Sequence, residues 1–140
     1  MSALICLALN IFWEARGEDK KYGILAMAAP ALVVLNRVED PRYPNNVCDV
    51  IKQSKTYANG SPIRNQCQFS WYCDGKSDLP NDLEAWKWSK LVARMVIEGK
   101  IEDVTNGATH YHAYYVSPKW NIKKTMTTTI GSHIYYRWET

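Results

Sequence analysis

The sequence lacks the features that would place it outside the ordinary globular proteins. It has no apolar run long enough to span a membrane, and its apolar start, MSALICLALNIFW, lacks the charged region and cleavage site of a secretory signal. It also lacks internal repeats, low-complexity tracts and a charged tail, and its net charge of +3 is too small to indicate nucleic-acid binding. We therefore expect one domain over residues 1–140, made in the cytoplasm without a signal peptide.

Cysteine is scarce, with four residues and no CxxC spacing, which argues against a structural zinc site. Cys6 falls within the first apolar stretch, so we expect it to be a small core residue. The other three, Cys48, Cys67 and Cys73, can supply one disulfide, for which Cys48–Cys67 is our first choice. Three free thiols are the alternative for a protein that stays in a reducing compartment.

Phenylalanine is rare, at two residues, whereas there are six Trp and nine Tyr. Tyr and Trp combine a flat apolar body with a polar tip, which suits a protein that binds sugars or other flat polar ligands. The alternative is that these side chains only fill a small mixed core.

Apolar spacing predicts a first helix over residues 2–16, along one face of which lie Leu4, Leu7, Ile11 and Glu14. Gly17 is a natural end for this helix, and Glu18 suits the start of the next one. The second helix, over residues 22–38, is apolar almost all round, so we expect it to be central. Pro30 falls inside it and should kink it or split it in two.

Three further segments follow this central helix. Asn46 can cap a short helix that carries Val47, Val50 and Ile51. Residues 53–82 read as a long irregular loop, which inside a compact domain is usually functional or partly structured. An amphipathic helix then begins near residue 82 and ends at Gly99, with its apolar face formed by Trp88, Leu91, Val92, Met95 and Val96.

The C-terminal part has strand character. In a strand over residues 109–116, successive side chains point to opposite faces. His110 and His112 therefore share one face, and Tyr111 lies on the other. Residues 125–130 and 133–138 flank Gly131-Ser132, which predicts a hairpin.

Glu14 is the strongest catalytic candidate, because it continues an apolar helix face. Burial should raise the pKa of such a carboxyl, and a raised pKa is what a general acid needs near neutral pH. The alternative is a structural ion pair with Arg16 or Lys20. Glu18 is the only other acid in a position to assist, although it also suits a simple helix start.

Two other groups offer chemistry. His110 and His112 have a metal-ligand spacing, and together with His133 or Glu14 they could hold zinc and activate water. The alternative is a half-buried strand with satisfied imidazoles. Residues 68–72, QFSWY, place Phe69 and Ser70 in a stretch that suits a sugar shelf or a loop pinned by its aromatics.

The order of motifs resembles the cell-wall hydrolases typified by the spore-cortex-lytic enzymes SleB and CwlJ. The resemblance covers nearly the whole chain, and its motifs are EARGE (14–18), VLNRV (34–38), VCDVI (47–51), QFSW (68–71), TNGATHYH (105–112), Pro118-Lys119-Trp120 and IGSHIYYR (130–137). One of these motifs alone would be weak, but all of them in this order are specific.

The resemblance implies an α+β, lysozyme-like fold related to lytic transglycosylases and goose-type lysozymes, mainly helical with a small antiparallel sheet in the C-terminal half. It also implies cleavage of the MurNAc–GlcNAc bond of peptidoglycan, with Glu14, the first glutamate of EARGE, as the catalytic acid. Around it we predict a cleft lined by Phe69, Ser70, Thr109, Tyr111, His112 and His133. No cofactor is expected.

Two departures from the pattern bear on this prediction. The central helix is about three residues longer than usual around residues 29–31, which adds nearly one turn. The wall-binding module and signal peptide of many relatives are also missing, which is typical of a phage endolysin released through a holin. We expect a monomer that acts on the wall after its release, without stable membrane insertion.

Several alternatives remain open at this stage. If water replaces the muramyl C6 hydroxyl as the nucleophile, the enzyme is a muramidase and Glu18 could assist. A zinc-dependent N-acetylmuramoyl-L-alanine amidase would use the three histidines. A wall-binding module without activity would need neither glutamate.

Overall fold

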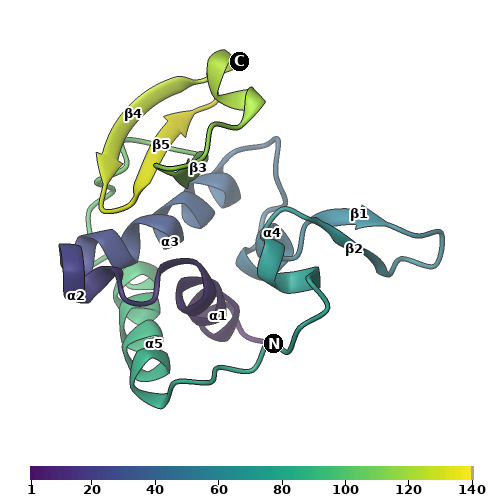
Figure 1. The fold of residues 1–140 in the computed structure, drawn as a ribbon, viewed down its shortest axis with the longest axis horizontal. Helices are drawn as coiled ribbons and strands as arrows, with labels where there is room; N and C mark the ends of the chain where they lie inside the picture. The colour runs from purple at the N-terminus through teal and green to yellow at the C-terminus, as the bar shows by residue number, and fades with distance from the viewer. Residues whose placement is uncertain (140) are drawn as a thin grey trace.

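The structure is a computed structural model that describes residues 1–139, and the chain forms a mainly helical body with two small antiparallel sheets (Figure 1). In chain order the elements are α1 (Ala3–Ala15), α2 (Glu18–Tyr22), α3 (Ile24–Glu39), α4 (Val47–Ile51), β1 (Ser54–Thr56), β2 (Pro62–Cys67), the 3-10 helix η1 (Ser70–Cys73), α5 (Leu83–Ile97), β3 (His110–Ala113), the 3-10 helix η2 (Lys119–Lys123), β4 (Thr125–Ile130) and β5 (His133–Arg137).

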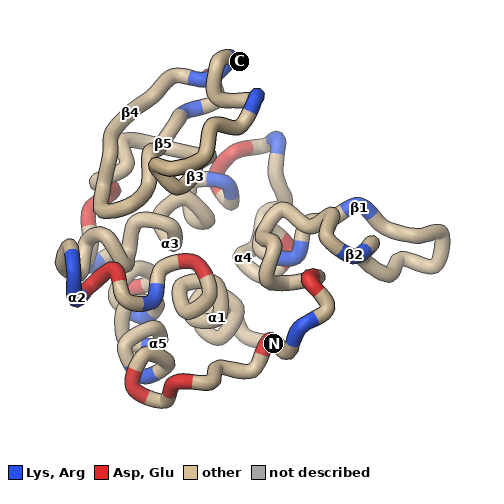
Figure 2. The backbone as a smooth tube through the Cα atoms, viewed as in Figure 1, with Lys and Arg blue, Asp and Glu red and all other residues tan. Residues whose placement is uncertain are grey.

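The core is built around α1 and α3, as the apolar spacing predicts. α1 packs against α3, α4 and α5, and Leu7, Ile11 and Val34 are fully buried there. Burying each such side chain stabilises the fold by about 1.5–3 kcal/mol. Figure 2 shows that α1 carries charge only near its C-terminal end, where Glu14 lies.

The start of the central helix differs from the prediction. Glu18 opens a separate short helix, α2, and Gly23 with a φ of +95° divides it from α3. This left-handed conformation favours glycine and cannot continue a helix. Gly17, with a φ of +88°, ends α1 as predicted.

Pro30 lies inside α3 without splitting it, so the predicted split is wrong. Proline removes one hydrogen bond and costs a helix about 3 kcal/mol. Burial on all sides offsets this cost, because α3 contacts α1, α2, α4, α5 and β4. The extra residues around 29–31 therefore form part of a continuous helix.

The three-stranded sheet covers one side of α3 and has the order β3-β5-β4 (Figure 1). β4 and β5 form the predicted hairpin around Gly131-Ser132, and the register of the pair shifts between Met126 and Thr128. Tyr135 is fully buried between the sheet and Ala29 and Val33 of α3. The shorter β3 pairs with β5 from His110 to Ala113.

The cysteines form two disulfides, Cys6–Cys48 and Cys67–Cys73, so the predicted Cys48–Cys67 pairing is wrong and Cys6 is not free. Cys6 lies on the side of α1 that packs against α4, where its Cα is 5.4 Å from that of Cys48. Cys67 ends β2 and faces Cys73 at the end of η1. Sequence spacing alone does not show which helix α1 packs against.

Residues 53–82 are more regular than predicted. β1 and β2 form a hairpin that projects from the body, and η1 follows it (Figure 1). Trp71 of η1 is buried, and its indole donates to Asn10 of α1 at 2.8 Å. The aromatic residues of this stretch therefore anchor it to the core.

The amphipathic helix α5 forms with Asp82 as its cap, and Val92 and Val96 of its predicted apolar face are buried. Trp88 and Leu91 are 40% and 45% exposed. Two smaller residues that were not predicted, Ser89 and Ala93, complete the face that packs inward with Val92 and Val96. Small side chains let two helices approach closely, and periodicity alone does not distinguish such a face from its larger neighbours.

No helix within residues 1–139 is long and apolar enough to cross a membrane.

Candidate active site

Glu14 lies in the last turn of α1 and faces β3. Its carboxylate accepts a hydrogen bond from the hydroxyl of Tyr111. Burial raises the pKa of Glu14 above its usual value, and the bond from Tyr111 and the positive charge of Arg37 partly oppose this effect. A carboxyl with a raised pKa stays protonated at a higher pH than a solvated one, as a general acid must.

Tyr111 keeps its own proton in this arrangement. Burial and then the neighbouring Glu14 carboxylate raise its pKa well above the usual value. Its ring also packs against Tyr135 and His133 of β5, at centroid distances of 5.4 and 5.2 Å. Tyr111 is therefore a fixed hydrogen-bond donor that points at Glu14.

Arg37 acts on Glu14 by its charge and contacts other residues of the site. It is only 3% exposed, and its Nε donates to the carbonyl of Thr109 at 2.7 Å. Its guanidinium lies over the rings of Tyr43 and Phe69, at 4.9 and 5.6 Å. Thr109 and Phe69, both predicted cleft residues, thus meet at one buried cation.

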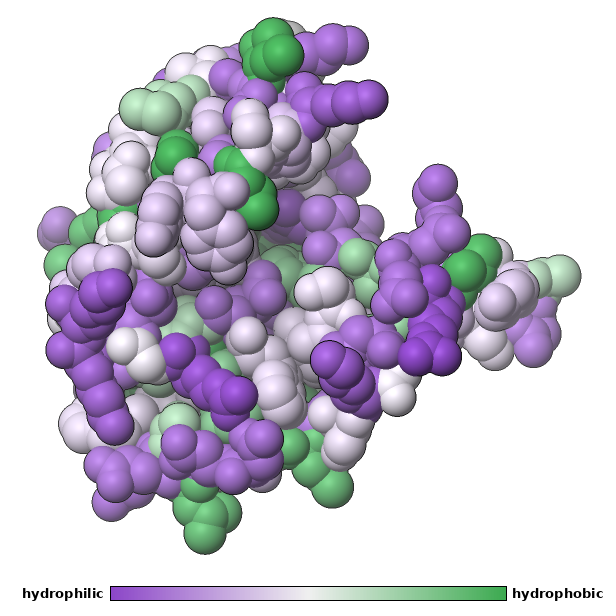
Figure 3. Space-filling model, in the orientation of Figure 1, coloured by the Kyte–Doolittle hydropathy of each residue, from purple (hydrophilic) through white to green (hydrophobic). Residues whose placement is uncertain are grey.

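The residues around Glu14 come from two sides of a hollow in the molecule. Tyr111 belongs to the lobe of β3, β4 and β5, and Phe69 directly precedes η1 on the side of α4 and the β1–β2 hairpin. Figure 3 shows a concave, largely polar surface between these two sides. Ser70 is exposed on the second side.

Glu18 occupies a different environment. Its Oε1 accepts hydrogen bonds from the amide and the hydroxyl of Ser132, at 3.0 and 2.8 Å, and lies 3.6 Å from Nδ1 of His133. These contacts tie α2 to the β4–β5 turn. Burial lowers the pKa of His133, although Glu18 opposes this effect, so His133 is neutral near pH 7.

The histidines lie on both faces of the sheet. His110 and His112 share one face, as predicted, and both contact Trp120. His112 bonds to Tyr136 and to the carbonyl of Ala113, so its predicted place beside Glu14 is not supported. His133 lies on the opposite face with Tyr111.

The three histidines therefore cannot converge on one metal ion. Within residues 1–139 no group of three or more His, Cys, Asp or Glu side chains is arranged to hold one. Burial and the nearby charges of Arg37, Lys124 and Arg42 lower the pKa of His110 to about 3, which leaves it neutral. The zinc amidase alternative thus lacks the ligand set that it requires.

Neither Arg37 nor Tyr43 was predicted to belong to the site. A usable signal was present for Arg37, because it is the only cation in a helix that is apolar over its first twelve residues. Such a residue must find polar partners within the core.

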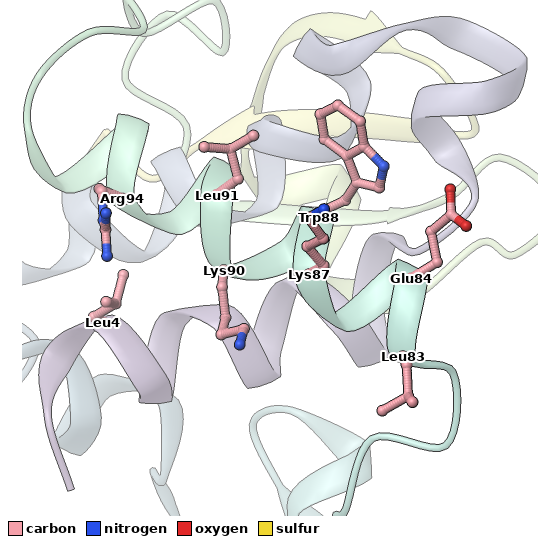
Figure 4. A pocket seen from close by; sticks show the side chains of 8 residues that line it. All are labelled: Leu4, Leu83, Glu84, Lys87, Trp88, Lys90, Leu91 and Arg94. Carbon is pink, nitrogen blue, oxygen red and sulfur yellow. The ribbon is translucent and has the colours of Figure 1, made fainter.

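A large surface groove involves none of these residues. It has a volume of about 800 Å³ and lies along the outer side of α5 (Figure 4), where it is lined by Leu4, Leu83, Glu84, Lys87, Trp88, Lys90, Leu91 and Arg94. It contains a single acid and none of the predicted site residues.

A family model described as cell wall hydrolase matches residues 21–136. The chain belongs to the cell wall hydrolase family. The match begins after Glu14, so it does not itself include the proposed acid. Among curated proteins no sequence matches this chain.

Two solved structures share the fold of this hydrolase. The catalytic domain of the germination-specific lytic transglycosylase SleB from Bacillus anthracis is 25% identical, with a TM-score of 0.72 over 96% of this chain and 93% of that chain. The catalytic domain of the Bacillus cereus SleB protein is also 25% identical, with a TM-score of 0.71 over 96% and 89% of the two chains. The predicted α+β, lysozyme-like fold is thereby confirmed, as is membership of the SleB-type family.

Proposed function

We propose that this cell wall hydrolase is a lytic transglycosylase that cleaves the MurNAc–GlcNAc bond of peptidoglycan, with Glu14 as its general acid and base. The observation that carries the proposal is the pairing of Glu14 with Tyr111 at a partly buried position, where burial raises the pKa of the carboxyl. The likeness to the SleB lytic transglycosylase domain supports the same reaction.

In the first step Glu14 donates its proton to the glycosidic oxygen as the bond from that oxygen to C1 of MurNAc breaks. The Glu14 carboxylate that remains is stabilised by the hydrogen bond from Tyr111 and by the charge of Arg37. In the second step the C6 hydroxyl of the same MurNAc attacks C1 and gives its proton to Glu14. This forms a 1,6-anhydro ring and restores the acid.

The second glutamate supports the transglycosylase over the muramidase route. A muramidase needs a group that activates water, and Glu18 is the predicted candidate. Its Oε1 is already engaged by Ser132, which suits a structural role better than a catalytic one. The transglycosylase route needs no second carboxylate, because the nucleophile belongs to the substrate.

The deciding experiment is mass spectrometry of the muropeptides that wild type and Glu14→Gln release from purified peptidoglycan, with Glu18→Gln as the matched control. We expect 1,6-anhydromuramic ends from wild type and Glu18→Gln, and none from Glu14→Gln. Reducing muramic ends would identify a muramidase instead. Free stem peptides, or full activity of Glu14→Gln, would overturn the assignment of Glu14.

We also propose a biological role for this enzyme. It would lyse the host as an endolysin that a holin releases to the wall. The two disulfides are consistent with action outside a reducing cytosol. Expression in bacterial cells with and without a holin tests this role. Lysis that depends on the holin supports it, and lysis without the holin points to another export route.

A further inference from the structure

Arg37 is a buried cation without a direct counter-ion. Its side chain is 3% exposed, and no carboxylate within residues 1–139 lies at ion-pair distance from it. Removing a charge from water is costly unless hydrogen bonds and opposite charges replace the lost solvation. Here the replacement is partial, because Nε bonds to Thr109 while Nη1 is buried with no hydrogen-bond partner among these residues.

The charge of Arg37 acts on the site through space. Burial lowers the pKa of Arg37, and Tyr43, Tyr111 and Glu14 oppose this effect, in that order. In the reverse direction, Arg37 lowers the pKa of Glu14 against the effect of burial. Charges interact more strongly in a poorly solvated interior than in water, so this influence does not need direct contact.

The groups around Glu14 include few other charges that could supply the same effect. From β3, Tyr111 faces Glu14 as a neutral donor. From β5, Tyr135 is close enough for the Glu14 charge to act on it, and burial raises its pKa, so it is also neutral. His133, in contact with the Tyr111 ring, is neutral near pH 7. Arg37 is the cation that acts on Glu14 from α3.

Arg37 also holds the strand that presents Tyr111. Its bond to the carbonyl of Thr109 lies just before β3 begins, and the Thr109 amide donates to the carbonyl of Tyr136 at 2.9 Å. Since Tyr111 follows in the same strand, a shift of Thr109 would move the hydroxyl that bonds to Glu14. One residue thus controls both the charge near the acid and the position of its donor.

We propose that Arg37 is a positioning residue of this site: its buried guanidinium supplies the positive charge that Glu14 meets, and its bond to Thr109 fixes the strand that carries Tyr111. The residue does not contact substrate, because its side chain is covered by Phe69 and Tyr43 and is almost wholly buried. The catalytic consequence of this inference rests on the proposed role of Glu14.

The test compares Arg37→Met, which removes the charge, with Arg37→Lys, which keeps it. Arg42→Met serves as the control, because Arg42 pairs with Asp40 and is not among the groups that act on Glu14. For each variant, kcat and KM on solubilised peptidoglycan are measured against pH. The carboxyl carbon of Glu14 is followed by NMR through the same pH range.

We expect Arg37→Met to lower kcat by roughly tenfold at neutral pH with little change in KM. The high-pH limb of its kcat profile and the midpoint of the Glu14 NMR titration should both move to higher pH. Arg37→Lys should restore both midpoints toward wild type, and Arg42→Met should leave them unchanged. A purely structural role for Arg37 would lower stability and leave both midpoints in place, which would overturn the proposal.

A second pair of variants allows the test to be carried out even if Arg37→Met is unstable. If Arg37→Met does not fold, the NMR midpoint of Glu14 in Arg37→Lys is compared with that in Arg37→Gln. An equal midpoint in these two variants overturns the proposal, and a higher midpoint in Arg37→Gln supports it. Because the NMR titration needs no substrate, it separates a failure of this inference from a failure of the proposed glycosidase activity.

Discussion

Glu14 and Glu18 flank the same turn and are both partly buried, but their surroundings differ. Glu14 accepts a hydrogen bond from one phenol and is influenced by the charge of Arg37, and burial is the largest influence on its pKa. One oxygen of Glu18 accepts hydrogen bonds from both the amide and the hydroxyl of Ser132. A carboxyl that accepts a single hydrogen bond suits proton transfer, whereas one that accepts two from a neighbouring turn suits the joining of two elements.

The largest expected difference between the two is in activity. Glu14→Gln should lower the rate of peptidoglycan cleavage by roughly 10³-fold, because it removes the proton donor. Glu18→Gln should stay within about fivefold of wild type, because its loss affects packing more than chemistry. Release of soluble glycan fragments at fixed enzyme concentration measures both. Equal losses in the two variants would remove the distinction and favour a second catalytic carboxylate.

Tyr111→Phe should have the next largest effect, a loss of roughly tenfold in kcat. The hydroxyl lowers the pKa of Glu14, so its removal should shift the high-pH limb of the activity profile upward. Tyr72→Phe is a suitable control, since Tyr72 packs against the core from η1 and is not among the groups that act on Glu14. An unchanged pH profile in Tyr111→Phe would show that the bond to Glu14 does not influence the proton.

Around Glu18 the expected effect is on stability. Glu18→Gln should lower the free energy of unfolding by about 1–2 kcal/mol, because two charge-assisted hydrogen bonds to Ser132 weaken. Ser132→Ala should give a smaller loss, since only the hydroxyl bond disappears. Urea denaturation at pH 7 measures both. A loss of stability larger in Ser132→Ala than in Glu18→Gln would contradict this order.

The smallest effect is a gain in stability for Glu14→Gln. The folded-state pKa of Glu14 lies above the usual value of 4.5, so the folded chain holds a proton that the unfolded chain has already released. The free energy of unfolding of wild type therefore falls as the pH rises from about 4.5 through the folded pKa. Glu14→Gln lacks this fall and should be more stable at pH 7 by up to about 1 kcal/mol. The two proteins should converge below pH 4.5 in the same urea measurement.

Many helix ends and turns could be predicted from the sequence, because they depend on residues within a few positions of one another. Gly17 at the end of α1, Asn46 as the cap of α4 and the Gly131-Ser132 turn each act within a few residues. The burial of Glu14 was predicted from its place on an apolar face. Alternation in the strand placed His110 and His112 together.

The misses have a common physical cause, since each depends on which surfaces meet in three dimensions. The partner of Cys6 follows from the packing of α1 on α4, and the exposure of Trp88 follows from the closer fit of small residues on α5. Arg37 becomes informative only once its burial is known.

The register shift in β4 bears on how the protein behaves at high concentration. β4 is an edge of the three-stranded sheet, and an exposed edge can pair with a strand of another molecule. The irregularity between Met126 and Thr128, with Lys123 and Lys124 just before the strand, makes this edge a poor template for such pairing. The same features that give the sheet its shape therefore disfavour pairing of this edge with a strand of another molecule.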